Sequence, residues 1–273
     1  MFGDHNSVQT KSFTTDEVYG VTRDVPLNYV TRKKVDDSFV STLTRDKHVV
    51  IFGSSKQGKT CLRKHCLKDD DYILVQCSNK WNIQELHSNI LKRAGFQVVQ
   101  SEKKTIEGTN KINAGLKAGF MGISAELGGE KGSTETSEVE VHDLELDPGD
   151  VNDIIAALKA ANFQKFIVLE DFHYLPVSTQ IDFSVALKAF HEASKVCFII
   201  IGVWLDNDRL IVYNGDLTGR VVSVDADTWT EEELGSVISW AQKCSTLLLI
   251  QRLQRVSLSF LSSVSTLFKR VAA

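Results

Sequence analysis

The stretch from His48 to Thr60 constrains the fold of this chain more than any other. Residues 48–52 form an apolar run of strand character, and a loop of the form Gly-x-x-x-x-Gly-Lys-Thr follows at residues 53–60. A strand, this loop and a helix in succession are the required context of a P-loop, or Walker A motif. The stretch therefore predicts a phosphate-binding loop at the end of a buried strand.

Each residue type in this loop suits the binding of a phosphate chain. Gly53 and Gly58 lack a Cβ atom, so the backbone can adopt open dihedral angles and bring its N–H groups close to phosphate. The helix that begins after Gly58 adds unpaired N–H groups and the positive end of its dipole. We predict that Lys59 reaches the β- and γ-phosphates and that Thr60 supplies a hydroxyl to Mg²⁺. The predicted nucleotide-binding residues are Gly53, Ser54, Ser55, Lys56, Gln57, Gly58, Lys59, Thr60 and Cys61.

A pair of acids ends a second apolar run. Residues 166–169 are apolar, and Glu170 and Asp171 follow them as in a Walker B element. Because strand and helix patterns alternate along the chain, we expect a parallel sheet with its ligand at the carboxyl ends of the strands. Glu170 is then predicted to hold Mg²⁺ with Thr60, and Asp171 to orient and deprotonate the attacking water. The reverse assignment stays open, because Glu is the more usual base and Asp the more usual metal-side acid.

Several side chains elsewhere are candidates for the same site. Arg209 and Arg220 flank the polar segment before the last predicted strand. Arg220 is the favoured candidate to touch the γ-phosphate of its own or a neighbouring subunit and to stabilise transition-state charge. A surface or salt-bridging role is the alternative for both arginines. His173 is interpreted as a packing residue rather than a phosphate sensor, and Trp204 or Tyr29 as a partner that stacks on the base.

Composition sets the broad class of protein. The 273 residues include 24% charged and 42% hydrophobic residues, with a net charge of -4, which is ordinary for a soluble globular protein. No basic stripe of the kind that marks a nucleic-acid surface is evident, and the clusters Arg32-Lys33-Lys34 and Arg63-Lys64-His65 are interpreted as solvated faces. No apolar run approaches the roughly 18 residues of a membrane span, and no signal peptide is visible. Five cysteines without close spacing indicate neither a disulfide framework nor a zinc site, so we expect a cytoplasmic location.

The sequence pattern divides the chain into three parts. Residues 1–17 are polar and predicted to be disordered. Residues 18–228 are predicted to form an α/β three-layer sandwich with a mostly parallel central sheet. About residues 100–146 form an insertion in this core. Seven of the 17 glycines lie in one stretch of 25 residues of this insertion, and apolar residues alternate with polar or glycine positions from Ile112 to Phe120 and at Val139 and Val141. This pattern predicts a mobile segment with a β-hairpin. Residues 229–273 are predicted to form a small helical lid.

Three stretches together resemble the ATPase module of bacterial AAA+ and STAND proteins, which are signalling and anti-phage-defence switches. These are Gly53–Thr60, Leu169–Leu175 and Asn214–Arg220, and the resemblance covers about residues 18–250. The resemblance implies binding of ATP and Mg²⁺, and slow hydrolysis of ATP to ADP and phosphate. It also implies that nucleotide state controls homo-oligomerisation or a separate effector protein.

The chain departs from the pattern of that family at three points. Glu170 stands where the family usually has Asp, and no polar sensor residue ends the strand at Ile201-Gly202. A Gly-x-Pro element, common in the STAND lid, is absent, since the prolines are Pro26, Pro148 and Pro176.

Two other functions stay open from the sequence. One is a scaffold that holds ATP without hydrolysing it and acts through the glycine-rich insertion. The other is a small-molecule kinase, although kinases do not need a pair of acids at a strand end. A GTPase is disfavoured, because the nearest match to the guanine-binding motif, Asn79-Lys80-Trp81-Asn82, ends in Asn rather than Asp.

Overall fold

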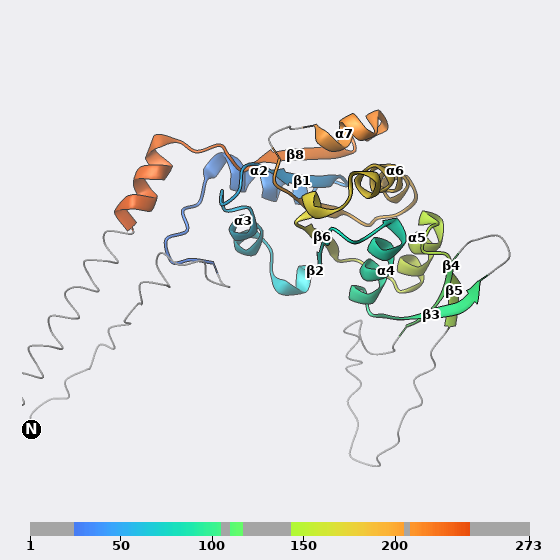
Figure 1. Cartoon of the computed structure of the whole chain (residues 1–273). Coiled ribbons are helices and arrows are strands. Elements are labelled where there is room, and N and C mark those ends of the chain that lie inside the picture. The colour runs from blue at the N-terminus through green and yellow to red at the C-terminus, as the bar shows by residue number, and fades with distance from the viewer. Residues whose placement is uncertain (1–24, 105–109, 117–142, 205–207, 241–273) are drawn as a thin grey trace, which may run out of the picture. The chain divides into compact units, whose positions relative to one another are not determined.

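The computed structural model describes residues 25–104, 110–116, 143–204 and 208–240 (Figure 1). The chain forms two compact units, of which Lys33–Thr228 is one. The described residues of the other are 25–32 and 229–240. The segment predicted to be disordered, 1–17, lies outside the described residues.

The smaller unit contains one described helix, over residues 231–240. The hydroxyl of Thr230 accepts from the Glu233 N–H at 3.2 Å, and the Glu233 carboxylate accepts from the Thr230 N–H at 2.9 Å. This reciprocal pair is the capping box that a Thr followed by a Glu three residues later predicts. The rest of the predicted helical lid, from residue 241, lies outside the described residues.

A five-stranded parallel sheet forms the centre of the larger unit, with strand order β2-β6-β7-β1-β8 (Figure 1). The strands are β1 (His48–Phe52), β2 (Tyr72–Gln76), β6 (Phe166–Glu170), β7 (Phe198–Ile201) and β8 (Val221–Asp225). Every neighbouring pair is parallel. Parallel strands need long crossover connections, which here contain helices. All five strands therefore end at the same edge of the sheet.

Helices cover both faces of this sheet. On one face lie α2 (Lys33–Leu43) and α3 (Lys59–Cys66), and on the other lie α4 (Ile83–Arg93), α5 (Val151–Ala160), α6 (Val177–Ala193) and α7 (Arg209–Tyr213). Successive side chains of a strand point to opposite faces. In β1, Val49 and Ile51 pack into a cluster with Phe39 of α2, whereas Val50 and Phe52 pack into a cluster with α4, α5 and α6. The predicted α/β class with a mostly parallel central sheet is confirmed.

A second sheet stands where the sequence predicts a mobile insertion. Its strands β3 (Phe96–Lys104), β4 (Asn110–Leu116) and β5 (Asp143–Leu146) pair antiparallel in that order. β4 contains Ile112 and Ala114 of the alternating run that predicts a hairpin, whereas Val139 and Val141 lie outside the described residues. β3 is a strand that the prediction lacks. Ile112, Ala114 and Leu146 belong to the same core cluster as the helices α4 and α5. The base of the insertion is therefore part of the packed core, and residues 117–142 lie outside the described part of the chain.

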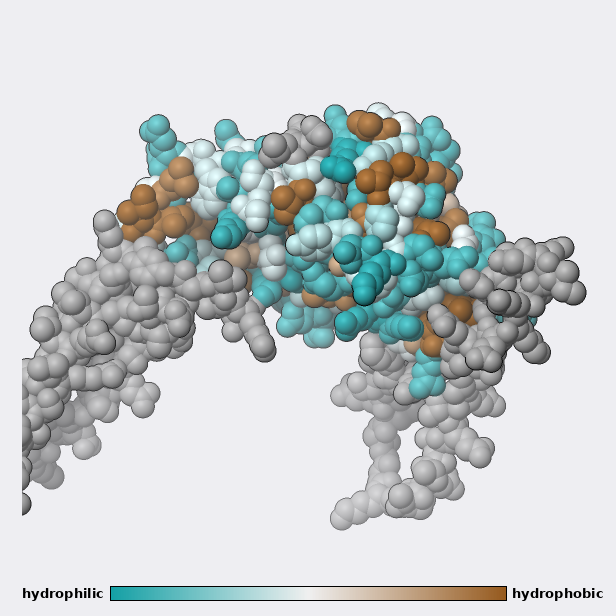
Figure 2. All heavy atoms as spheres, viewed as in Figure 1, coloured by the Kyte–Doolittle hydropathy of each residue, from teal (hydrophilic) through white to brown (hydrophobic). Residues whose placement is uncertain are grey.

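The surface of α6 and α7 mixes polar and apolar side chains. Val177, Ile181 and Val185 of α6 are exposed at a spacing of four residues, and Val212 of α7 is 78% exposed. Figure 2 shows hydrophobic residues over these helices among mostly hydrophilic neighbours.

Among the helices of the described residues, none combines the length and the apolar character needed to cross a bilayer.

Candidate functional site

The Gly53–Thr60 loop leaves the carboxyl end of β1 and leads directly into α3. Gly53 has φ of 135° and Gly58 has φ of 79°, a region that strains L side chains, so these two glycines permit the path of the loop. Gly58 is the residue that precedes the first turn of α3. The amino end of that helix, with its N–H groups, therefore opens onto the loop.

The predicted binding residues form this loop and the start of α3, and they differ in solvent exposure. Gly53 and Lys59 are buried, Ser54, Gln57, Gly58 and Cys61 are half-buried, and Ser55, Lys56 and Thr60 are exposed. The loop thus has a buried lysine and a solvent-facing rim.

The Lys59 ammonium is held inside the loop by backbone carbonyls. Its Nζ donates to the carbonyl oxygen of Gly53 at 2.9 Å and to that of Ser54 at 2.5 Å. Burial lowers the pKa of Lys59, and the carboxylates of Asp227, Asp171 and Glu170 act against that shift. Two backbone carbonyls therefore hold the ammonium, and three carboxylates act on its charge.

Thr60 and Glu170 are in direct contact, although 110 residues separate them along the chain. The Thr60 hydroxyl donates to Oε1 of Glu170 at 2.5 Å. Glu170 is the last residue of β6 and is 6% exposed. The fold thus brings together the two side chains that the sequence predicts as the ligands of Mg²⁺.

Asp171 leaves the sheet in a different direction from Glu170. Its backbone lies in the left-handed region, with φ of 55° and ψ of 38°, which Asp adopts more readily than most residues. Its Oδ2 accepts from Nε2 of Gln76, the last residue of β2, at 2.5 Å. The turn after Glu170 therefore gives the two acids different neighbours and separates their environments.

Arg63 is a residue of the site that sequence reasoning assigned to a solvated face. The structure corrects that interpretation: Arg63 is 2% exposed, and its Nε lies 3.1 Å from Oε2 of Glu170. Its Nη1 donates to the hydroxyl of Tyr72 at 2.5 Å. The signal that could have found it is its spacing, because Arg63 lies four residues after Lys59 and so on the same face of α3.

Asp227 is a second residue that sequence reasoning missed. Both of its carboxylate oxygens accept from the Ser54 N–H, at 2.7 and 2.9 Å, and the Ser54 hydroxyl donates to Oδ2 at 2.8 Å. The β1–β8 ladder pairs Phe52 with Asp225, which carries Asp227 to the start of the loop. A Cβ atom on Gly53 would lie 2.6 Å from Oδ1 of Asp227. Gly53 thus makes room for this contact, and no short motif in the sequence marks it.

His173 lies among the charged groups of the site. Its Nδ1 accepts from the Val203 N–H at 3.2 Å. Burial lowers the pKa of His173, the carboxylate of Asp171 raises it, and the cations of Lys59 and Arg209 lower it further. The imidazole therefore connects the turn after β6 to the segment after β7.

Trp204 packs in the core, and this corrects the expectation that it stacks on a base. Its side chain is 5% exposed and meets Phe172 edge to face at 6.3 Å between ring centroids. A Cβ atom on Gly202 would lie 1.6 Å from the indole. The close approach of the indole explains why glycine, rather than a polar residue, follows β7. Tyr29 belongs to the other compact unit, so its expected contact with a base stays a prediction.

The two candidate arginines lie in different places. Arg220 precedes β8, at the edge of the sheet opposite the Gly53–Thr60 loop. It donates to the Glu192 carboxylate at 2.6 Å and to the carbonyl of Asp216. This position does not fit a contact with a γ-phosphate held in the loop of its own chain. Arg209 begins α7, after β7, where its guanidinium lies 6.0 Å from the Trp204 ring centroid and its Nε donates to the Tyr213 hydroxyl at 3.0 Å. Its charge acts on His173, whose pKa it lowers.

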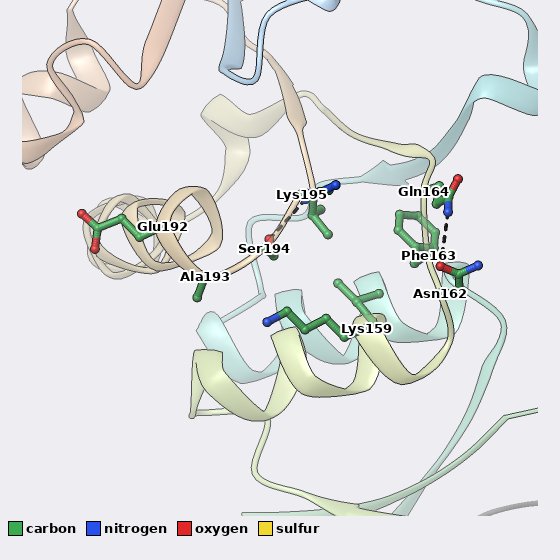
Figure 3. Close-up of a pocket in the computed structure, with 10 residues that line it drawn as sticks. Lys159, Asn162, Phe163, Gln164, Glu192, Ala193, Ser194 and Lys195 are labelled. Carbon is green, nitrogen blue, oxygen red and sulfur yellow. Dashed lines mark hydrogen bonds between the residues drawn. The ribbon is translucent and has the colours of Figure 1, made fainter.

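A cavity of about 730 Å³ opens at the same far edge of the sheet (Figure 3). Residues at the ends of α5 and α6 and before β6 and β7 line it, including Lys159, Phe163, Glu192 and Lys195. The cavity is therefore separate from the loop, and Glu192 within it is the partner of Arg220.

The arrangement decides the fold type. A parallel α/β sheet carries a Gly-x-x-x-x-Gly-Lys-Thr loop between β1 and α3, and the acid that ends β6 contacts the threonine of that loop. The chain has a P-loop NTPase fold. This fold places the ligand at the carboxyl ends of the strands.

Solved structures resemble this chain at low sequence identity. A Walker-type ATPase of Pyrococcus abyssi is 11% identical with a TM-score of 0.46, and the match covers 78% of this chain and 58% of that one. A Signal Transduction ATPase with Numerous Domains (STAND) protein with a tetratricopeptide repeat sensor, from Pyrococcus horikoshii, is 14% identical with a TM-score of 0.46, over 82% and 28%. Cdc6p from Pyrobaculum aerophilum is 12% identical with a TM-score of 0.42, over 82% and 51%. The chain thus spans less than two thirds of the length of each.

No protein-family model matches the sequence, and no curated protein matches it at a significant level.

Proposed function

We propose that this chain binds ATP with Mg²⁺ and hydrolyses it to ADP and phosphate, as a switch of the AAA+/STAND type. The observation that carries the proposal is the 2.5 Å contact between Thr60 and Glu170, made beside the buried ammonium of Lys59. It places a hydroxyl, a carboxylate and a cation together at the mouth of a glycine-bent loop.

The donor set fits Mg²⁺, which prefers oxygen ligands and usually keeps several waters and phosphate oxygens in its shell. The Thr60 hydroxyl and Oε1 of Glu170 are such ligands. When bound, Mg²⁺ would neutralise charge on the phosphate oxygens. The contact of Glu170 with Thr60 favours Glu170 for the metal role, as first assigned, and leaves Asp171 for the other.

Lys59 would bind the phosphate chain by exchanging partners. Its ammonium donates to two neutral carbonyl oxygens of the loop. A phosphate oxygen is a charged acceptor, and hydrogen bonds between charged partners are about twice as strong as neutral ones. The ammonium therefore has a reason to leave the carbonyls when a triphosphate enters.

Asp171 would orient and deprotonate the attacking water. Its Oδ2 is held by Gln76 at 2.5 Å, which leaves Oδ1 as the oxygen that would accept the proton. Arg220 would act from a neighbouring subunit, since it lies at the opposite edge of the sheet from its own loop. The proposed switch would then work in the cytoplasm, either as a homo-oligomer or with a separate effector protein, and a defence role is one output that fits it.

The test is ATP binding and hydrolysis by purified protein with Mg²⁺, measured across protein concentration with molar mass recorded alongside. We expect Lys59→Ala to abolish binding, and Asp171→Asn to keep binding while hydrolysis falls by at least about 100-fold. A rate per chain that rises with assembly, and that Arg220→Ala removes, would support the role of Arg220 in a neighbouring subunit. Wild-type protein that binds no ATP would refute the proposal.

A non-hydrolysing ATP scaffold is the second candidate. It is favoured by Gly202, which stands after β7 where a polar side chain would contact the γ-phosphate in the family that the sequence resembles. Tight retention of ATP without phosphate release, in every oligomeric state, would decide for the scaffold. Transfer of phosphate to a small-molecule acceptor in a screen would instead decide for a kinase.

A further inference from the structure

Arg63 connects the first helix after the loop to the acid that ends β6. Its guanidinium contacts Oε2 of Glu170 through Nε at 3.1 Å and the Tyr72 hydroxyl through Nη1 at 2.5 Å. The Tyr72 hydroxyl in turn donates to Oδ1 of Asp69 at 3.0 Å. Arg63 is thus held at both ends of its planar group, by one side chain from β6 and one from β2.

The two oxygens of Glu170 have different partners as a result. Oε1 accepts from the Thr60 hydroxyl at 2.5 Å, and Oε2 faces Arg63. A carboxylate that is free to rotate can present either oxygen, or both, to a metal. Here the guanidinium occupies one oxygen, so the carboxylate plane is set and Oε1 is the oxygen directed to Thr60.

Charge gives a second reason for this contact. The side chains of Arg63 and Glu170 are 3% and 8% exposed. A buried carboxylate without a partner is strongly disfavoured, and removing one member of a buried pair leaves the other uncompensated. Arginine suits this place better than lysine, because its flat group makes two directed contacts at once.

We propose that Arg63 is a positioning residue for the Mg²⁺ site, acting through Glu170. The inference rests on the proposed function, since it assigns Glu170 to the metal. Arg63 keeps Oε1 beside the Thr60 hydroxyl and leaves Oε2 unavailable to the ion, so that Glu170 binds through a single oxygen. Residues that orient a metal ligand in this way typically change metal affinity by about 10- to 100-fold when they are replaced.

The experiment compares the wild-type 273-residue chain with Arg63→Met, Arg63→Lys and Tyr72→Phe. Fluorescent ATP is first titrated into each protein in EDTA to measure its affinity without metal. Mg²⁺ is then titrated into each protein with a fixed amount of fluorescent ATP. Folding is checked by circular dichroism. We expect Arg63→Met to raise the Mg²⁺ concentration for half-saturation by about 10- to 100-fold, with ATP affinity in EDTA unchanged. Arg63→Lys and Tyr72→Phe should give smaller shifts in the same direction. Arg93→Met, which removes an exposed arginine from α4, should behave as wild type.

A double variant shows whether Arg63 acts through Glu170. In the Glu170→Gln background, Arg63→Met should cause no further change in the Mg²⁺ requirement. A folded Arg63→Met with a wild-type Mg²⁺ requirement would overturn the inference, as would full additivity in the double variant. If Arg63→Met does not fold, an unchanged requirement in both Arg63→Lys and Tyr72→Phe overturns it equally. These results differ from failure of the proposed function, which would appear in the wild-type arm as no ATP binding, and would refute both.

Discussion

Acidification should destabilise this protein through His48, the first residue of β1. Its imidazole is 1% exposed. Nδ1 accepts from the Phe198 N–H at 3.1 Å, and Nε2 lies 3.1 Å from the Leu187 carbonyl oxygen. Both ring nitrogens are therefore occupied in the neutral form, with the proton on Nε2. A second proton on Nδ1 would face the Phe198 N–H and find no acceptor.

The size of the effect follows from the pKa of His48. Burial lowers it from 6.5 to about 4. Because the folded protein binds the proton more weakly than the unfolded chain does, the neutral imidazole favours folding above pH 6.5. That contribution is lost as the pH falls from 6.5 through 4. The shift corresponds to about 3 kcal/mol in full, of which about 2 kcal/mol is lost between pH 7.5 and pH 5.

The assay is urea unfolding of the wild-type 273-residue chain and of His48→Gln at pH 7.5, 6, 5 and 4.5. Glutamine offers a donor and an acceptor of similar reach and does not titrate, so the other groups cancel in the difference between the two proteins. The unfolding free energy of the wild type should fall relative to that of the variant by about 2 kcal/mol from pH 7.5 to pH 5. A difference that stays constant over this range would refute the reasoning.

Two further substitutions test the geometry of the site. Gly202→Ser should lower the unfolding free energy by about 1–3 kcal/mol in a urea titration, because a Cβ atom there would lie 1.6 Å from the Trp204 indole. Gly215→Ala is the control, since a Cβ atom on Gly215 would meet no atom within 4 Å. A tolerated Gly202→Ser would contradict the packing. Asp227→Ala should cost about 1.5–3 kcal/mol, because Ser54 loses a charged acceptor for its N–H and its hydroxyl. Asp227→Asn keeps one acceptor oxygen and should cost less, and equal losses for the two variants would count against this account.

The sequence by itself determined the features that depend on residues close together in the chain. The strand, loop and helix around Gly53–Thr60 could be predicted because glycines at fixed spacing and a preceding apolar run specify them locally. The parallel α/β class followed from the alternation of strand and helix patterns. The pair Glu170-Asp171 could be recognised because it ends an apolar run. The strand β3 escaped prediction, because its residues 100–104 are all polar and show no alternation.

The tertiary structure decided which distant side chains meet. Glu170 lies 107 residues from Arg63, and Ser54 lies 173 residues from Asp227. Contacts over such separations depend on strand order and register, which hydrophobic periodicity does not specify. The sequence of Arg63-Lys64-His65 is polar at every position. Only the fold shows that Arg63 is buried against Glu170. For the same reason, only the fold shows that Arg220 lies at the edge of the sheet opposite the Gly53–Thr60 loop.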